Sequence, residues 1–278
     1  MNLPAPWTVT PGPGPLVALA IHHGHDLRPE VAARCGVAEA DRRREEDPFT
    51  GGWAAAADAG VVVHRSRFEI DLNRPRADAV YLGPEQAWGL TPWEESPSAG
   101  VLARSRTLYD DFYRELETLL RPKLAIHGRV VVLDLHSYNH RRGGPGAVPA
   151  PPVDNPDVNV GTGSLDRPPW AGLIDGFMDD LRAFAFPGGP LDVRENVRFR
   201  GGELSRWVHR RFPGRAGCLA LEFKKIFMDE WTGRPDPGRC EAVGRALTAA
   251  VPGLRRQLGR MPMSSFTRVP NFSPPASH

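Results

Sequence analysis

The amino-acid sequence predicts an α/β protein with a mostly parallel or mixed central sheet. Short apolar runs typical of strands alternate along the chain with segments that carry apolar residues at helical spacing. The run VVVLDL (130–135) is apolar almost throughout and rich in valine, as expected for a central strand covered on both faces. The other strand-like runs are LVALAIH (16–22), VVVH (61–64) and GCLALEF (217–223).

Helices are indicated by apolar periodicity and by the turn residues that bound each segment. In the segment 100–120, Leu108, Phe112 and Leu116 recur every four residues, and Pro122 is expected to end that helix. The charge run 41–47 is expected to be a solvated helix end or loop, and 65–75 a short extended piece. Further helices are expected over 50–60, 170–186, 205–212 and 238–258.

The chain shows neither an internal repeat nor a linker that would divide it, so we expect a single domain over residues 1–278. The Pro/Gly-rich start (1–15) and the Ser/Pro-rich end (262–278) are expected to be irregular tails. With 278 residues and 41% hydrophobic composition, the chain is long enough to bury one large core. The Gly/Pro-rich stretch 141–156 is too long for a simple connection and reads as a functional or mobile loop.

Charge and composition exclude several classes of partner. The 35 basic residues are spread along the chain and balanced by 33 acidic ones, giving a net charge of +2, so nucleic acid is not an expected partner. The first residues lack the basic and apolar regions of a signal peptide, and no apolar run approaches the ~20 residues that span a bilayer. The three cysteines are widely spaced. We therefore expect a cytoplasmic protein that does not bind membranes.

Polar residues of catalytic types occur in or at the ends of three predicted strands. His22 and His136 end the first and third apolar runs, and Glu222 lies between apolar neighbours in the last. Because functional groups gather at the carboxyl ends of strands in such sheets, these side chains are expected to meet. Two histidines and one carboxylate around an open position form a common catalytic zinc set. The third ligand is left open among His25, Glu46 and Asp47.

Each of these residues also has a structural interpretation. A histidine at a strand end is more often a hydrogen-bonded structural residue than a metal ligand. Three imidazoles between His22 and His25 weaken that interpretation, because giving hydrogen-bond partners to all three costs free energy unless they have a function. Glu222 could be a buried partner of an arginine, because a carboxylate in an apolar strand is expensive unless it is paired. On the residues alone, a metal hydrolase and a structural explanation both stay open.

The order of several motifs resembles the N-formylglutamate amidohydrolase family, a relative of the zinc carboxypeptidases. RSRFEIDLNRP (65–75) is similar to a family signature that ends in Asp-x-Asn-Arg-Pro, and DLHS (134–137) to the second metal-binding His motif. NVRFRGG (196–202) and LALEF (219–223) are similar to the Gly-Gly stretch and to the strand that bears the catalytic Glu. The first motif departs from the family's Pro-His-Ser-Gly, since this chain has Ile21-His22-His23-Gly24, and Arg198 stands where the family usually has Pro.

The resemblance implies a three-layer α/β/α fold with a central mixed sheet, as in the zinc carboxypeptidases. It also implies one zinc or similar divalent ion, bound by His22, His136 and, as favoured third ligand, Asp47, with Glu46 and His25 as alternates. Asp134 is not expected to bind the metal itself, but to contact one of the metal-binding side chains and orient it.

The same resemblance assigns roles in hydrolysis of a linear amide. Glu222 would act as general base and then general acid, and Arg67, with Arg65 behind it, would stabilise the oxyanion. Arg74 and Asn73 would bind a substrate carboxylate, with Asn196 and His140 as weaker candidates for lining the pocket.

The implied substrate is a small carboxylate-bearing amide, namely an N-formyl or other N-acyl amino acid similar to glutamate. One alternative is a carboxypeptidase- or aspartoacylase-like enzyme that acts on a different N-acyl amino acid or small peptide. A second is a non-catalytic metal-binding protein, to which the histidine cluster alone could point. The presence of Glu222 and Arg74 at their motif positions disfavours the second, because metal storage requires neither.

Overall fold

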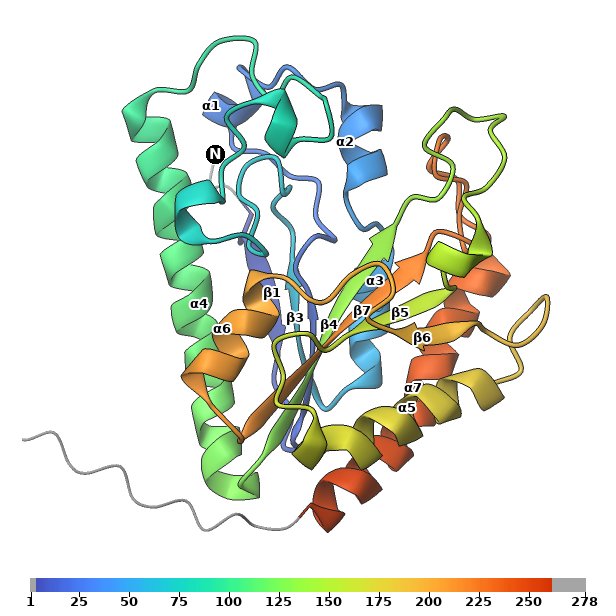
Figure 1. The fold of residues 1–278 in the computed structure, drawn as a ribbon. Coiled ribbons are helices and arrows are strands. Elements are labelled where there is room, and N and C mark those ends of the chain that lie inside the picture. The colour runs from blue at the N-terminus through green and yellow to red at the C-terminus, as the bar shows by residue number, and fades with distance from the viewer. Residues whose placement is uncertain (1–3, 262–278) are drawn as a thin grey trace, which may run out of the picture.

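The computed structural model describes residues 4–261, which build one seven-stranded mixed sheet with the order β1-β3-β2-β4-β7-β5-β6 (Figure 1). Strands β3, β2, β4 and β7 run parallel to one another, β1 pairs antiparallel with β3 at one edge, and β5 pairs antiparallel with β7. The strands are β1 (Trp7–Thr10), β2 (Leu16–Ala20), β3 (Ala59–Val63), β4 (Val130–Tyr138), β5 (Val158–Gly161), β6 (Val193–Glu195) and β7 (Ala216–Lys224).

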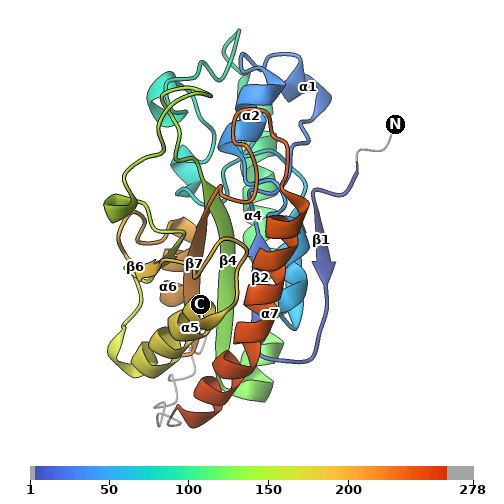
Figure 2. The ribbon, with the colours of Figure 1, turned by 90° about the vertical axis from the view of Figure 1, so that its right-hand side faces the viewer.

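Helices cover both faces of this sheet, which confirms the predicted three-layer α/β/α fold (Figures 1 and 2). One face packs against α5 (Ala171–Ala183) and α7 (Pro237–Arg260), through a core that includes Phe177 and Leu254. The other face packs against α4 (Ala99–His127) and α6 (Glu203–Arg211), through a core that includes Phe112 and Leu204. Among residues 4–261, no helix has the length and apolar character needed to cross a membrane.

The carboxyl ends of the parallel strands β2, β4 and β7 lie at one end of the sheet, beneath the short helices α1 (Pro29–Ala32) and α2 (Glu39–Glu45) at the top of Figure 1. In the register of β4 and β7, His136 lies directly opposite Glu222. Opposite residues on paired strands point to the same face, so the sheet itself places these two side chains next to each other.

The strand predictions at 16–22, 61–64, 130–135 and 217–223 are confirmed, whereas β1, β5 and β6 were not predicted. The segment 1–15 was expected to be irregular, but Trp7–Thr10 forms β1, because Trp7 and Val9 pack on the core that contains Phe112 and the backbone pairs with β3. Strands β5 and β6 have four and three residues, too few to show a hydrophobic pattern. The C-terminal segment 262–278 lies outside the described residues.

Helix α4 continues past Pro122 to His127, so the prediction that proline ends it was wrong. The proline removes one backbone hydrogen bond, but tertiary contacts stabilise the last turn. Leu124 is buried against the sheet, and the Lys123 ammonium donates to the carbonyls of Gly12 and Gly14 at 2.5 and 2.7 Å.

Two further local expectations were wrong, one of them in part. The segment 65–75 forms turns rather than a strand, because Ser66 and Asp71 side chains accept hydrogen bonds from nearby backbone N–H groups, which competes with strand pairing. The charge run 41–47 contains the end of helix α2, as one of the two expectations had it, and Asp41 and Arg43 are exposed, but the segment as a whole is not solvated. It enters the interior at the top of the sheet, where Glu46 and Asp47 are almost completely buried.

Candidate metal centre and surrounding pocket

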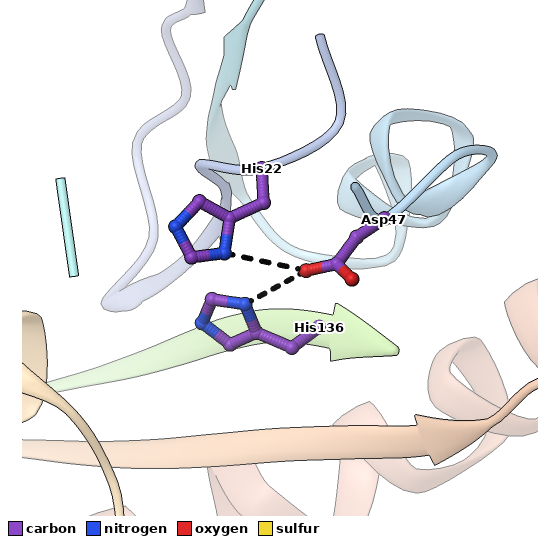
Figure 3. Close-up of side chains that lie close together, drawn as sticks. All are labelled: His22, Asp47 and His136. Atoms are coloured by element: carbon purple, nitrogen blue, oxygen red, sulfur yellow. Dashed lines mark hydrogen bonds and ion pairs between the residues drawn. The ribbon is translucent and has the colours of Figure 1, made fainter. Parts of the chain in front are cut away.

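The structure brings His22, Asp47 and His136 together in one buried cluster (Figure 3). Their potential ligand atoms lie within 4.8 Å of one another. The Asp47 Oδ2 atom lies 3.4 Å from His22 Nδ1 and 3.0 Å from His136 Nδ1. All three side chains are at most about 2% exposed, so the cluster is shielded from bulk water.

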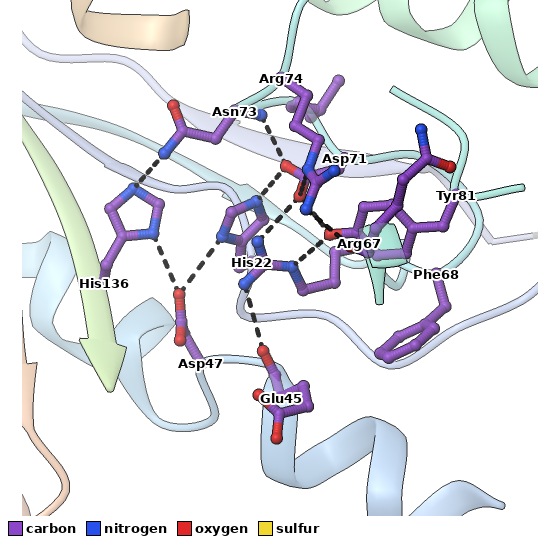
Figure 4. Close-up of polar contacts among 12 residues, drawn as sticks. His22, Glu45, Asp47, Arg67, Phe68, Asp71, Asn73, Arg74, Tyr81 and His136 are labelled. Atoms are coloured by element: carbon purple, nitrogen blue, oxygen red, sulfur yellow. Dashed lines mark hydrogen bonds and ion pairs between the residues drawn. The ribbon is translucent and has the colours of Figure 1, made fainter. Parts of the chain in front are cut away.

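A carboxylate lies on the far side of each imidazole, Asp71 behind His22 (Figure 4) and Asp134 behind His136. His22 Nε2 bonds to Asp71 Oδ1 at 2.8 Å, and His136 Nε2 lies 2.9 Å from Asp134 Oδ1, although the Asp134 oxygens have no well-aligned donor among the described residues. A carboxylate behind a histidine fixes the ring and raises the basicity of its other nitrogen toward a metal. Both rings therefore present Nδ1 to Asp47, and Asp134 lies where the sequence placed it.

The donor set fits a divalent metal ion. His22 Nδ1 is buried and lacks a hydrogen-bond partner within residues 4–261, which is costly unless an ion or a proton occupies the position. Burial opposes ionisation of Asp47, but the hydrogen bond with His136 and the nearby His22 imidazole outweigh it and hold the pKa of Asp47 well below its ordinary value. A carboxylate that stays ionised between two imidazoles is the charge state that metal binding requires.

The backbone explains how residues far apart in sequence meet at this point. His22 follows β2, and its carbonyl accepts a hydrogen bond from the Asp47 N–H at 2.9 Å. Asp47 follows the C-terminus of α2, and its other oxygen accepts from Ser137 Oγ at 3.1 Å. Since Ser137 adjoins His136 on β4, the same strand orients both a histidine and the carboxylate.

The structure does not bring the alternate ligands into the cluster. Glu46 is buried but points away, where its carboxylate bonds to His25 Nδ1 and to Ser66 Oγ. His25 is thereby engaged outside the cluster. His23 lines other cavities, and burial lowers its pKa to about 4. Of the open alternatives, Asp47 is the carboxylate in the cluster.

Glu222 lies in the wall of the same pocket, opposite His136 in the strand register. The residue is partly exposed to the pocket, but its carboxyl group is sheltered. Burial raises the pKa of Glu222 to about 7, and the negative charges of Asp47 and Asp134 act in the same direction against the opposing effect of His136. A carboxyl group with a pKa near neutrality can both accept and release a proton.

The pocket has a volume of about 370 Å³ and is strongly charged. It is open to solvent, and Trp88 and Phe199 contribute aromatic walls. Its acidic residues are Glu45, Asp47, Asp71 and Glu222, and its basic residues are Arg67, Arg74, Arg142, Arg198, Arg200 and Lys225.

Two of the predicted substrate-contacting residues line the pocket while also bonding to its wall. Arg67 donates to Asp71 Oδ2 at 2.8 Å, to Tyr81 Oη at 3.0 Å and to the Glu45 carbonyl at 3.2 Å (Figure 4). These bonds use three of its five N–H groups. Arg74 is less constrained, with one bond to the Gln86 carbonyl and a longer ion pair of 3.6 Å to Asp71.

Asn73 also lines the pocket, but its side chain is engaged in positioning other groups. Its Nδ2 lies 3.3 Å from His136 Nε2, and its Oδ1 accepts from the Leu204 N–H at the start of α6. Asn73 therefore joins a candidate ligand to a helix terminus, and its contact with substrate stays a prediction.

The remaining predicted site residues are not among those that line the pocket. Asn196 bonds to Thr162 through both side-chain atoms, and the backbone N–H of His140 donates to Glu230. Arg65 donates to the Pro4 carbonyl and so does not stand behind Arg67.

Several pocket residues were missed by the sequence analysis. Asp71 lies inside the quoted 65–75 motif, so its position there was an available signal. Arg198 was noted only as a departure from the family pattern. Lys225, Glu45 and Arg142 carry no signal in the sequence, because they reach the pocket through the packing of loops that are distant along the chain.

The fold and the site together define an α/β/α protein of hydrolase type with a candidate metal centre at the carboxyl ends of its parallel strands. The model of the N-formylglutamate amidohydrolase family matches residues 14–227, which is more than half of the chain. The chain belongs to this family, as the sequence motifs indicated.

Similar folds occur in solved structures. An N-formylglutamate amidohydrolase from Ralstonia eutropha superimposes with a TM-score of 0.73 at 20% identity, over 91% of this chain and 97% of that one. A gene product from Agrobacterium tumefaciens gives 0.59 at 15% identity, over 90% and 96% of the two chains. At these identities the likeness concerns the fold. A comparison with curated proteins gives no match.

Proposed function

We propose that the chain hydrolyses the amide bond of an N-formyl or other N-acyl amino acid similar to glutamate. The observation that supports this most directly is the buried His22–Asp47–His136 cluster in one pocket with Glu222. Zinc is the proposed ion, because two imidazoles and one carboxylate are a set that zinc commonly uses in hydrolases. A divalent ion bound by these three residues supplies Lewis acidity at the strand ends.

Glu222 moves the proton in the proposed reaction. Its carboxylate accepts a proton from the attacking water and transfers it to the departing nitrogen, a sequence for which a pKa of about 7 is suited. His136 lies opposite in the strand register, so the proton acceptor is fixed on the sheet next to a candidate ligand.

Two arginines complete the proposed site. Arg67 retains N–H groups that are not used by Asp71, Tyr81 and Glu45, and these groups stabilise negative charge that develops on the amide oxygen. Arg74, whose guanidinium group is held less tightly, binds the substrate carboxylate through paired hydrogen bonds.

We further propose a small-molecule substrate and a cytoplasmic location. Cys35, Cys218 and Cys240 are all free thiols, which suits a reducing compartment. The pocket of about 370 Å³ fits a small amide better than a folded partner.

Metal analysis and substrate profiling together test the proposal. Protein purified without added metal should contain about one divalent ion per chain, and Asp47→Ala together with His136→Ala should abolish it. The intact protein should hydrolyse at least one member of a panel of N-formyl, N-formimino and N-acyl derivatives of glutamate and aspartate. Metal without hydrolysis of any amide would favour a non-catalytic metal-binding protein, and absence of metal would reject the site altogether.

A further inference from the structure

Arg198 and Arg200 are the pocket arginines that have no carboxylate partner among residues 4–261. Arg67 and Arg74 both pair with Asp71, and Arg142 makes a bidentate pair with Glu45 at 2.9 and 3.1 Å. In contrast, Arg198 bonds only to the neutral Asn155 Oδ1 at 2.9 Å, and the Arg200 side chain makes no hydrogen bond or ion pair within the described part of the chain. Their charge is therefore not compensated by protein groups.

The backbone that carries these two arginines is fixed on the sheet. Asn159, which is fully buried on β5, accepts from the N–H groups of Arg198 and Phe199 and donates to the Phe199 carbonyl at 2.8 Å. The Arg200 carbonyl in turn accepts from the Gly163 N–H at 2.8 Å. The segment 198–200 is thus anchored at each residue.

Two glycines permit the close approach that this anchoring requires. Gly201 has φ of +98°, which a residue with a side chain rarely adopts. A Cβ atom on Gly161 would lie only 2.7 Å from the Gly201 nitrogen. The loop therefore fits tightly against β5, and its arginines are held at the pocket in advance of any ligand.

The pairing of β5 with β7 connects the anchored arginine segment to the strand that carries Glu222. Asn159 lies opposite Glu222 in the antiparallel register of β5 and β7. The Arg198 guanidinium lies 5.5 Å from the Tyr138 ring and 5.4 Å from the Phe199 ring, which limits the directions in which it can point. An uncompensated cation whose main chain is anchored, in the same pocket as a proposed proton acceptor, is suited to bind an anionic group of the substrate.

We propose that Arg198 and Arg200 determine substrate specificity by binding a second carboxylate, carried on the side chain of the N-acyl amino acid. Arg74 belongs to the segment that follows β3, whereas Arg198 is anchored on β5, so the two cationic positions originate on opposite sides of strands β4 and β7. A substrate with carboxylates at both ends spans them with its amide bond near Glu222. This inference rests on the proposed function and adds to it the residues that bind the side-chain carboxylate of the substrate.

Steady-state kinetics on two isosteric substrates tests the proposal. N-formylglutamate and N-formylglutamine differ mainly in the charge of the side chain. The wild-type protein should have a KM for the charged substrate about tenfold below that for the neutral one, as expected for a charge-assisted hydrogen bond in a partly solvated pocket. In the double variant Arg198→Met/Arg200→Met, the two KM values should become equal.

Arg114→Met is the matched control, because Arg114 is 71% exposed on α4 and pairs with Asp111 away from the pocket. It should leave both KM values unchanged. A double variant that retains the tenfold preference would overturn the proposal, as would a wild-type protein without any preference.

A binding experiment separates failure of this inference from failure of the proposed function. Calorimetric titration of the zinc-loaded protein with glutarate and with its monoamide requires no turnover. We expect tighter binding of glutarate by the wild type and loss of that difference in the double variant. If this difference is found without any hydrolysis, the arginine assignment holds and the hydrolase proposal falls. Equal binding of both ligands by the wild type would refute the assignment.

Discussion

Glu222→Gln should abolish hydrolysis while it stabilises the protein, and this combination distinguishes a proton-transferring residue from a structural one. The side chain lies in the pocket wall opposite His136, and burial raises its pKa to about 7. A glutamine has nearly the same shape, so it should preserve packing and the neighbouring metal ligands while it removes the ability to exchange a proton.

The size of the stability gain follows from the pKa shift. A group whose pKa is higher in the folded than in the unfolded protein contributes stability that is present below pH 4.5 and is lost as the pH rises through about 7. A shift from 4.5 to about 7 corresponds to about 3 kcal/mol at pH 8. Because the residue is partly exposed, solvent screening reduces the expected gain to about 2 kcal/mol.

Urea unfolding of the metal-free wild type and the Glu222→Gln variant measures this gain. The metal must be removed because a cation would favour the ionised carboxylate. The variant should be about 2 kcal/mol more stable at pH 8 and nearly equal to the wild type at pH 4. In the metal-loaded protein its kcat should fall by about 10²- to 10⁴-fold with metal content unchanged. A variant that keeps its activity, or that is destabilised at pH 8, would refute this assignment of Glu222.

Three further predictions concern Lys225 in the pocket and two positions elsewhere in the fold, His209 and Gly217. Lys225→Met should weaken metal affinity about tenfold in a chelator competition. The buried Lys225 ammonium donates to the carbonyls of residues 44 and 46 and so fixes the segment that leads to Asp47. Unchanged affinity would contradict this role. Burial lowers the pKa of His209 to about 4, so protonating this residue opposes folding. The protein should therefore lose about 2 kcal/mol of stability between pH 7 and pH 5 in denaturant unfolding. His209→Gln should remove that part of the pH dependence. Gly217→Ala should lower stability by about 1–3 kcal/mol in the same assay, because a Cβ atom there would lie 2.7 Å from the buried Trp170 ring.

The parallel core of the fold could be predicted from the sequence because its strands are long or continuously apolar. Strands β2, β4 and β7 are buried on both faces, and this environment requires the apolar runs that the sequence displays. The short strands β5 and β6 depend on their neighbours rather than on a hydrophobic pattern of their own. The course of α4 past Pro122 likewise depends on tertiary contacts of Lys123 and Leu124, which local propensity does not record.

The candidate site could be predicted where its residues lie on or directly after those strands. His22, His136 and Glu222 project from the ends of β2, β4 and β7, so their meeting follows from the topology. Asp47 could not be separated from Glu46 by the residues alone, since neighbouring carboxylates after a short helix differ only in direction. The structure separates them because Glu46 turns toward His25 and Ser66.

The anchoring of the segment 198–200 on Asn159 has a consequence for changing the enzyme. The side chains of Arg198 and Arg200 extend from a loop whose hydrogen bonds to β5 all involve main-chain atoms. Their identity can therefore vary without loss of the bonds that hold the loop in place, provided that Asn159 and the two close glycines, Gly161 and Gly201, are kept. If the proposed recognition by Arg198 and Arg200 is correct, substitutions at these two positions should change the preferred substrate side chain without moving the candidate metal ligands or Glu222.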